Sequence, residues 1–480
     1  MFEKTGTGPH RSGDARPGRA IVRARRLGEG GAMTTSREIR LNAFDMACVG
    51  HIQQGLWTHP RDRSTDYLRL DHWTGLARLL ERGLFDGLFL ADVLGVYDVH
   101  GGSQDAAIRH GVQIPLLDPM LLVPAMAAVT RNLGFGVTVN LAWEPPALLA
   151  RRFSTLDHLT DGRIGWNIVT GYLDSAARAM GLDRQMAHDD RYDMADEFMG
   201  LVYRLWEESW AADAVKRDRA AGVYADPSRV ARIRHEGTQY RLDAPHLVEP
   251  SPQRTPVLYQ AGASERGRAF AARHAECVFI NGGPKHHVAA LVRDLRRRAA
   301  ARPIKAFMGV TLILGRTDAE ARDKLEDYRR CASVEAALVH ASASLGIDLA
   351  ALGPDDELPA APSEAIRSNV EALRAAAPHA TKQALIDRMI LGSRQPPIVG
   401  SAETVAATLI GWVDETDIDG FNLSRTVWPE CLEDVVALLV PALQERGRYK
   451  RGYAPGTYRE KLFGTGPRLV APHPAAAVGR

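Results

Sequence analysis

Short apolar runs alternate with amphipathic runs along the chain, from Leu41 almost to the C-terminus. The apolar runs have the length of buried strands. The other runs place hydrophobic residues at helical spacing, as Leu76, Leu79 and Leu80 do. This alternation is typical of βα units arranged around a parallel sheet, so the number of units decides which architecture we expect.

Eight such strands can be counted, and helices lie between and after them. We expect strands at residues 41–49, 86–91, 134–141, 163–169, 256–261, 277–280, 307–314 and 420–423. We expect helices at residues 71–82, 119–130, 146–159, 190–208, 264–274, 287–300, 318–330, 402–415 and 432–444. This series predicts an α/β fold of the (β/α)8 TIM barrel type.

Three stretches interrupt the rhythm and predict insertions after strands 1, 4 and 7. The first is a long polar loop, the second is the Asp- and Arg-rich segment 209–250, and the third is segment 331–400, with helical patterns at 334–345 and 363–376. We expect these insertions to act as lids over the barrel. The chain of 480 residues is long enough for about three domains, but the strand count favours one barrel domain at residues 33–465, with a flexible C-terminal tail at 466–480.

The first 32 residues have another character. Arginines lie among glycines and prolines there, without hydrophobic periodicity or a central apolar segment, which excludes a secretory signal. The acids Glu3, Asp14 and Glu29 also speak against a transit peptide. We expect residues 1–32 to be a disordered leader or an over-extended start upstream of Met33.

Composition and charge narrow the class of protein further. The net charge of +2 argues against a nucleic-acid partner, and no apolar run reaches the roughly 18 residues of a membrane span. The four cysteines lie far apart without a CxxC pair, which argues against a disulfide framework and a zinc ribbon. We therefore expect a cytoplasmic protein that acts without nucleic acid or membrane.

Polar residues follow several of the expected strands, where barrel enzymes place their chemistry. Asp92 ends the second strand, and Asn140 lies at the end of the third. A carboxylate at Asp92 is suited to accept hydrogen bonds from a ligand, although a structural carboxylate bonded to loop amides would give the same pattern.

Two motifs lie near expected helix starts. In QAGASERGRAF a strand runs through glycines into a helix beginning near Ser264, so backbone N–H groups face the barrel mouth and predict a phosphate cradle. An ordinary turn with a serine cap is the alternative. HDDRYD places His188 and Tyr192 four residues apart, where both side chains can reach one anionic group, unless His188 is simply a surface residue.

The first strand and its loop supply further candidates. His51 follows the strand, but its spacing to His59 and His72 matches no standard metal site, so we expect no metal. Phe44, Met46, Trp57 and Trp143 suggest an apolar substrate pocket, against the alternative that the tryptophans pack the barrel rim.

The ordered series of motifs also resembles one family. The runs LADVLGVYDVHGG, EPPALLARRFSTLDHLTDGRIGWNIVTGYLDSAARAMG, HDDRYDMADEFMGLVYRLWEESW, HLVEPSPQRTPVLYQAGASERGRAFAARHAE and GFNLSRTVWPECLEDVVALLVPALQERG are similar to those of the nitrilotriacetate and dibenzothiophene-sulfone monooxygenases. That family belongs to the bacterial-luciferase-like, FMN-dependent monooxygenases, and the resemblance spans about residues 41–463.

The resemblance implies a two-component enzyme. FMN would act as a diffusible reduced substrate (FMNH2) supplied by a separate NAD(P)H-dependent flavin reductase. O2 would react with it to a C4a-(hydro)peroxide, which inserts one oxygen atom into a small organosulfur or amine/heterocyclic substrate. A homodimer or homotetramer is also implied.

Carried over position by position, the resemblance implies flavin contacts from Asp92, Asn140, His188, Tyr192, Ala263 and Ser264. His51 and His188 are the candidates for controlling protonation, because imidazole titrates near neutral pH. A deazaflavin-dependent hydride-transfer enzyme on the same scaffold and a non-catalytic flavin-binding protein remain the alternatives.

Overall fold

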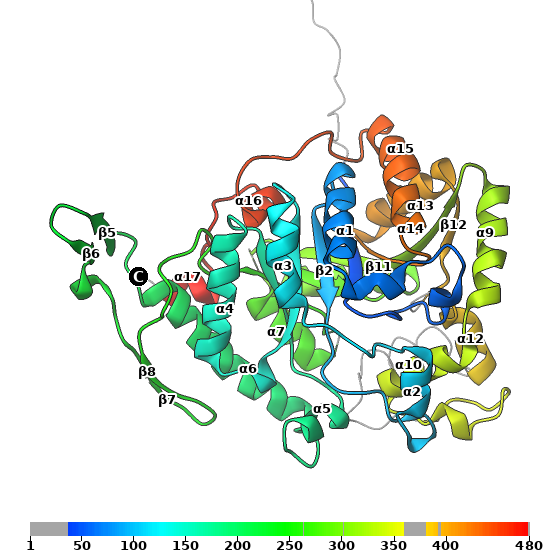
Figure 1. Ribbon diagram of the computed structural model, residues 1–480, viewed down its shortest axis with the longest axis horizontal. Coiled ribbons are helices and arrows are strands. Elements are labelled where there is room, and N and C mark those ends of the chain that lie inside the picture. Colours follow the sequence, from blue (N-terminus) through cyan, green and yellow to red (C-terminus); the bar gives the residue numbers. More distant parts are fainter. Residues whose placement is uncertain (1–36, 263, 301, 360–380, 392–394, 479–480) are drawn as a thin grey trace, which may run out of the picture. The chain divides into compact units, whose positions relative to one another are not determined.

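Eight parallel strands close into a barrel in the computed structural model, which describes residues 37–478 except 263, 301, 360–380 and 392–394 (Figure 1). Around the barrel these strands are β1 (Arg40–Met46), β2 (Gly87–Ala91), β3 (Gly134–Asn140), β4 (Ile164–Val169), β9 (Val257–Gln260), β10 (Cys277–Ile280), β11 (Lys305–Gly315) and β13 (Gly420–Ser424). Strand β13 pairs back with β1, so that Phe44 lies opposite both Ser424 and Phe89. The expected (β/α)8 barrel is therefore confirmed.

The helices of the βα units surround these strands. They are α1 (Leu70–Arg82), α3 (Pro119–Ala128), α4 (Pro146–Leu159), α6 (His188–Tyr203), α7 (Glu265–His274), α8 (Lys285–Arg298), α13 (Ala402–Thr416), α14 (Glu430–Asp434) and α15 (Val440–Glu445). Helix α6 continues through a π-helical turn at Arg204–Glu208, and a second such turn at Val435–Leu439 joins α14 to α15. The expected bounds of α4 and β10 match to the residue.

A tyrosine closes the N-terminal end of the barrel. Tyr458 is buried, and its hydroxyl bonds to that of Tyr259. A Cβ atom at Gly134 would lie 2.3 Å from the Tyr458 ring, and one at Gly87 would lie 2.4 Å from its hydroxyl. Strands β2 and β3 therefore need glycine where this ring packs.

The C-terminal segment packs against the barrel, which differs from the expected flexible tail at 466–480. It contains α16 (Tyr458–Phe463) and α17 (Pro474–Val478). His473 is only 1% exposed, and its Nε2 lies 2.9 Å from the carbonyl oxygen of His274. The proline- and alanine-rich sequence of this segment has no hydrophobic periodicity, so the sequence did not predict that it packs. Single small residues such as Ala475 make the contact with the barrel.

The insertions differ from the expectation in one respect. An insertion also follows β2, where α2 (Asp105–His110) lies. The segment 209–250 follows the long helix α6, as expected, and forms two hairpins, β5 (Val215–Asp218) with β6 (Val223–Ala225) and β7 (Ile233–Glu236) with β8 (Arg241–Ala244). The second hairpin packs along α6, where the His235 ring lies 2.9 Å from the Glu197 carboxylate.

Further insertion elements follow β4 and β11. They are α5 (Asp174–Ala179) after β4, and α9 (Asp318–Cys331), α10 (Val334–Leu345), α12 (Lys382–Met389) and β12 (Ile398–Ser401) after β11. Strand β12 pairs with the end of β11 outside the barrel. The expected helix at 334–345 is confirmed as α10, whereas the one at 363–376 and the leader 1–32 lie outside the described residues.

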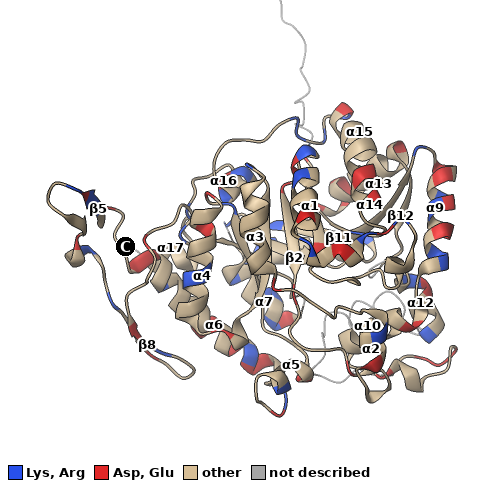
Figure 2. Ribbon diagram, in the orientation of Figure 1, with Lys and Arg blue, Asp and Glu red and all other residues tan. Residues whose placement is uncertain are grey.

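Two properties of the whole chain bear on its partners. Lysine and arginine are interspersed with aspartate and glutamate over the helices, as on α9 (Figure 2). Within the part of the chain that the structure describes, no helix is both long and apolar enough to cross a membrane.

Candidate functional site

A cavity of about 200 Å³ lies at the C-terminal end of the barrel strands. Its walls come from the ends of β2, β3, β4 and β9, from the segment after β4, and from the first turns of α6 and α7. Five of the candidate residues line it: Asp92, Asn140, His188, Tyr192 and Ser264. Side chains far apart in the sequence therefore meet where barrel enzymes hold their ligands.

The first turn of α6 contributes three of the lining side chains, His188, Arg191 and Tyr192. They stand at i, i+3 and i+4, so all three lie on one helix face. The His188 and Tyr192 rings meet edge to face with centroids 5.3 Å apart. Arg191 is 2% exposed and donates from Nη1 to the carbonyl oxygen of Gly171 at 2.6 Å.

The start of α7 faces the same end of the cavity. Ser264 caps this helix, because its Oγ accepts a hydrogen bond from the N–H of Gly267 at 3.1 Å. The same Oγ lies 3.5 Å from His188 Nε2. A Cβ atom at Gly262 would lie 2.8 Å from the Tyr192 hydroxyl, so glycine is required for the backbone to approach that hydroxyl. Ala263 lies outside the described residues.

The only acid in the first turn of α7 points to other partners. Glu265 forms ion pairs with Arg268 at 2.6 Å and with Arg298 at 2.8 Å. Its negative charge is therefore compensated outside the cavity, and the N–H groups of this helix start keep their attraction for an anion.

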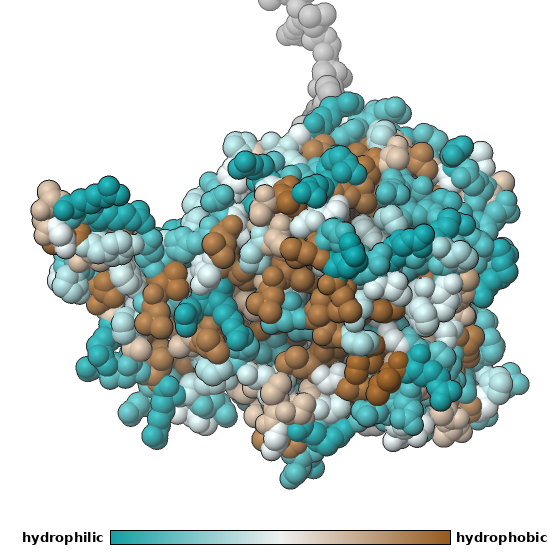
Figure 3. Space-filling view, viewed as in Figure 1, coloured by the Kyte–Doolittle hydropathy of each residue, from teal (hydrophilic) through white to brown (hydrophobic). Residues whose placement is uncertain are grey.

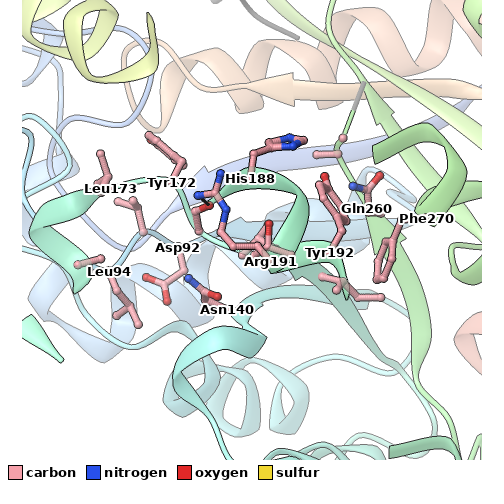
Figure 4. Close-up of a pocket in the computed structure, with 18 of the residues that line it drawn as sticks. Asp92, Leu94, Asn140, Tyr172, Leu173, His188, Arg191, Tyr192, Gln260 and Phe270 are labelled. Carbon is pink, nitrogen blue, oxygen red and sulfur yellow. Dashed lines mark hydrogen bonds between the residues drawn. The ribbon is translucent and has the colours of Figure 1, made fainter. Parts of the chain in front are cut away.

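Asp92 follows β2 and lies beside Asn140 in the cavity wall (Figure 4). Burial and, secondly, the negative charge of Asp118 raise the pKa of Asp92 to about 7. The carboxyl group therefore carries a proton in a large part of the population at neutral pH, and can donate as well as accept a hydrogen bond.

Asn140 uses its side chain partly for local structure. Its Oδ1 accepts a hydrogen bond from the N–H of Ala142 at 2.9 Å and caps the short helical turn Leu141–Trp143. Its Nδ2 lies beside Gly171, which has a φ of 75°, and a Cβ atom on that glycine would come within 2.5 Å of it. The amide group is thus held at the cavity wall by a turn that requires glycine.

The two ends of the cavity differ in character. Figure 4 shows Tyr192, Gln260 and Phe270 at one end, and Leu94, Tyr172 and Leu173 at the other. Ile168 and Val169 add further apolar surface. One end therefore offers hydroxyl, amide and helix N-terminal groups, and the other an apolar wall with the Tyr172 ring.

A hydrogen-bonded network continues from Tyr172 into the insertions. The Tyr172 hydroxyl lies 3.0 Å from the Tyr97 hydroxyl, which donates to Gln113 Oε1 at 2.6 Å. Gln113 Nε2 in turn donates to the backbone oxygen of His51 at 2.8 Å. The ring of His340 stacks on Tyr97 with centroids 5.7 Å apart. Residues after β1, β2, β4 and β11 thus join beside the apolar end of the cavity.

His51 belongs to the network of Tyr172, Tyr97 and Gln113 and does not line the cavity. It is 3% exposed, and its ring meets that of Phe44 edge to face at 4.5 Å. Burial, followed by the positive charge of Arg425 and by His340, lowers the pKa of His51 well below its ordinary value. Its imidazole is therefore uncharged at neutral pH, and Nδ1 has no hydrogen-bond partner among the described residues.

The other expected pocket residues lie in three different places. Phe44 also contacts Phe279, with centroids 4.9 Å apart, inside the barrel. Trp143 packs against the hydrophobic cluster that contains Tyr97 and Leu173, and its buried Nε1 has no partner in the described part of the chain. Trp57 is 37% exposed and donates to the carbonyl oxygen of His110, so the structure does not bring it to the cavity.

Several lining residues were not singled out from the sequence, chiefly Arg191, Tyr172 and Gln260. A signal existed for Arg191, because it stands between His188 and Tyr192 in the same motif at helical spacing. Tyr172 and Gln260 gave none, since one follows a strand in an irregular loop and the other ends an ordinary apolar strand. Among the described residues no three His, Cys, Asp or Glu side chains gather as metal ligands would.

A (β/α)8 barrel with a cavity at the C-terminal ends of its strands is typical of barrel enzymes. Comparison with known proteins identifies the family. Residues 47–417 match the family model described as luciferase-like monooxygenase. This chain belongs to the luciferase-like monooxygenase family.

Three relatives illustrate the match. The dimethyl-sulfide monooxygenase of Hyphomicrobium sulfonivorans is 46% identical over 92% of this chain and 93% of its own length. The dibenzothiophene-sulfone monooxygenase of Rhodococcus erythropolis strain XP is 36% identical over 90% and 97%. The crystal structure of a long-chain alkane monooxygenase superposes with a TM-score of 0.85 at 45% identity, over 92% of this chain and 99% of that one. The resemblance found in the sequence motifs is confirmed, and these relatives are all monooxygenases.

Proposed function

We propose that this chain is the oxygenase component of a two-component monooxygenase. It would bind reduced FMN from a separate NAD(P)H-dependent flavin reductase in the cavity, and insert one oxygen atom from O2 into a small organosulfur compound. The names of two relatives, a dimethyl-sulfide and a dibenzothiophene-sulfone monooxygenase, support the substrate class. The observation that carries the proposal is the cavity with an anion-binding end and an apolar end.

The anion-binding end suits the phosphate of FMN. Two helix starts, those of α6 and α7, face it, and Arg191 adds a buried positive charge. The Tyr192 and Ser264 hydroxyls can donate to phosphate oxygens. The backbone at Gly262 lies so close to the Tyr192 hydroxyl that only the hydrogen of glycine fits between them. These are the groups that commonly hold phosphate.

The apolar end suits the flat flavin ring. Ile168, Val169 and Leu173 offer aliphatic surface, while Asp92 and Asn140 present polar groups within that surface. When bound, reduced FMN supplies the electrons that activate O2. The protein orients the ring, and the insertions after β1, β2, β4 and β11 keep water from it.

The chain's own groups control protons at this end. Asp92, with a pKa of about 7, holds or releases a proton at neutral pH beside the ring position. We place the substrate beside the flavin ring on the side of the Tyr172–Tyr97–Gln113 network, towards the uncharged His51, Phe44 and Trp143. The proposed roles of His51 and His188 are to hydrogen-bond substrate and flavin, respectively.

A labelling experiment tests this function. The pure chain is titrated with reduced FMN under anaerobic conditions, and then supplied with a flavin reductase, NAD(P)H, ¹⁸O₂ and a panel of sulfides, sulfones, aminopolycarboxylates and cyclic amides. We expect binding of reduced FMN and one ¹⁸O atom in a sulfur-containing product. Failure to bind reduced FMN, or preferential binding of a deazaflavin, would contradict the proposal.

We also propose that the chain forms a homo-oligomer. Hydrophobic residues gather on the surface around α3 (Figure 3). Leu121 of α3 is 76% exposed, Leu70 at the start of α1 is 58% exposed, and Leu159 at the end of α4 is 59% exposed. Surface helices normally keep their outer face polar, so this face suits a second copy of the chain. We expect light scattering to show a dimer or tetramer that Leu121→Glu weakens, and a monomeric wild-type protein would contradict this.

A further inference from the structure

A second cavity lies at the N-terminal end of the barrel, opposite the strand ends that form the first one. It has a volume of about 150 Å³ and shares no lining residue with the other cavity. Arg40 at the start of β1 and Asp86 just before β2 form one wall. Lys450, Tyr453 and Lys461, from the segment that closes the barrel, form another.

The lining carries three cations, Arg40, Lys450 and Lys461, and only two acids, Glu38 and Asp86. Asp86 is the one deeply buried carboxylate of the lining, and two cations share it: Arg40 at 2.8 Å and Lys450 at 2.7 Å. Burial alone would raise the pKa of Asp86, but Lys450 and Arg40 lower it, so the carboxylate is charged. The other lining acid, Glu38, has a side chain that is 42% exposed and lies 3.4 Å from Arg40, so it also pairs with that arginine and not with a lysine.

Lys461 is the third cation, and it has no ion-pair partner among the described residues. Its Nζ reaches only the carbonyl oxygen of Asn132, at 3.4 Å, and lies 5.8 Å from the centre of the Tyr453 ring. Burial, and then the charge of Arg163, lowers its pKa to about 8. Lys461 is partly buried. Taking an ammonium group out of water is costly unless an anion accompanies it.

The acidic side chains near Lys461 accept hydrogen bonds from other groups. Glu81 accepts hydrogen bonds from the backbone N–H groups of residues 131–133. Glu460 caps α16 by accepting from Thr457. Neither of these acids lines the cavity.

The remaining lining groups offer few acceptors. Tyr453 donates its hydroxyl to the carbonyl oxygen of Phe85, and its ring lies within 6 Å of both lysine ammonium groups. Lys450 has three N–H donors and one carboxylate partner, and its side chain is 8% exposed. A cavity rich in donors and small in volume is suited to a compact ligand made of acceptors.

We infer that this cavity binds a small oxyanion, of the class of inorganic phosphate or sulfate, between Lys450, Lys461 and Arg40. The bound anion ties the closing segment 450–461 to the N-terminal ends of β1 and β2. This is a site separate from the flavin cavity, and it acts on stability rather than on the reaction.

Thermal unfolding of the full chain saturated with FMN tests the inference, since the flavin then fills any phosphate site in the first cavity. We expect inorganic phosphate or sulfate to raise Tm by several degrees beyond sodium chloride of equal ionic strength. The rise is lost in Lys461→Met, kept in Lys461→Arg, and weakened in the wild type above about pH 8, where Lys461 loses its charge. Lys216→Met, at an exposed position, is the matched control.

Three results would overturn the inference. One is a Tm rise in Lys461→Met equal to that of the wild type, and another is an equal rise with chloride. The third is a rise that disappears when FMN saturates the protein, which would assign the anion to the flavin cavity. Circular dichroism and FMN affinity report whether Lys461→Met is folded, and Lys461→Gln replaces it if it is not.

Discussion

At the scale of single residues, Asp92 makes the cavity sensitive to pH. Its pKa of about 7 follows from burial and from Asp118, and lies well above the ordinary value. The charged form is therefore disfavoured in the folded protein, so stability falls as the pH rises from about 4 towards 7. The affinity for any ligand that interacts with the Asp92 proton must therefore change over the same pH range.

We predict that Asp92→Asn removes this pH dependence. In the wild type, the affinity for reduced FMN should change with an inflection near pH 7, because the donor at Asp92 is lost above it. In Asp92→Asn the profile should be flat between about pH 6 and 8, with affinity lower by about tenfold. Asp118→Asn is the control, since it removes the neighbouring charge and should move the inflection to lower pH. An inflection that persists in Asp92→Asn would assign it to another group.

Arg191 is the residue on which we expect phosphate recognition to depend. Replacing its buried guanidinium removes a charge-assisted hydrogen bond, so Arg191→Met should weaken FMN binding by about 10- to 100-fold. Riboflavin, which has no phosphate, should bind both proteins alike in a fluorescence titration. Arg204→Met removes a more exposed arginine paired with Glu208, away from the cavity, and should change neither affinity. Equal losses for FMN and riboflavin would mean that Arg191 only supports the Gly171 turn.

At the scale of elements, the turn from β9 into α7 combines a helix start with a close backbone approach. A Cβ atom at Gly262 would lie 2.3 Å from Gln260 Nε2 and 2.8 Å from the Tyr192 hydroxyl. Both of these groups belong to residues that line the cavity, so an added Cβ atom displaces a part of its wall.

We therefore predict that Gly262→Ala lowers FMN affinity by more than about tenfold, with a change in unfolding free energy of no more than about 1 kcal/mol. Gly200→Ala in α6 is the matched control, because nothing lies within 4 Å of its Cβ position. It should leave FMN affinity unchanged and stabilise the protein by about 0.5–1 kcal/mol in urea unfolding. Normal FMN affinity in Gly262→Ala would show that this turn does not contact the flavin.

The elements that could be predicted from the sequence are those with a repeated apolar pattern. The strands of the barrel and helices such as α4 and α10 bury one or both faces, so their bounds could be read within a few residues. Hairpin strands β5 to β8 are three or four residues long and mostly exposed. The alternation in β7 and β8 is therefore too short to be recognised in the sequence. Strand β12 pairs outside the barrel, and its four residues gave no signal of their own.

The candidate site divides in the same way. Asp92, Asn140 and Ser264 end strands or begin helices, so the barrel geometry alone predicts that they meet. The network of Tyr172, Tyr97 and Gln113 could not be predicted, because it joins insertions whose paths depend on tertiary packing. Trp57 was expected in the pocket, but its loop places it at the surface. The path of that loop also depends on tertiary packing.

At the scale of the whole molecule, the C-terminal segment is fastened to the barrel by a buried ion pair. Arg459 is 1% exposed and donates to Glu276 at 2.7 and 2.9 Å. It also donates to the carbonyl oxygens of Thr255 and Pro256. The Arg459 side chain thus satisfies hydrogen-bond acceptors just before the starts of β9 and β10.

We predict that Arg459→Met destabilises the folded chain by about 3–5 kcal/mol in urea unfolding, because Glu276 stays buried without its partner. Arg229→Met, which breaks an exposed pair with Asp213, should cost no more than about 1 kcal/mol. The double variant Arg459→Met, Glu276→Gln should recover part of the loss. A small effect of Arg459→Met would show that the segment is held mainly by Tyr458 and His473.

The position of Tyr458 has a consequence for the order in which the barrel can form. Its ring packs against Gly87 and Gly134, although it lies more than 300 residues further along the chain. Strands β2 and β3 therefore cannot complete their packing before position 458 has been synthesised, and until then Glu276 lacks the counter-charge of Arg459. A chain truncated before position 458 would keep all eight barrel strands and leave the N-terminal end of the barrel unfilled.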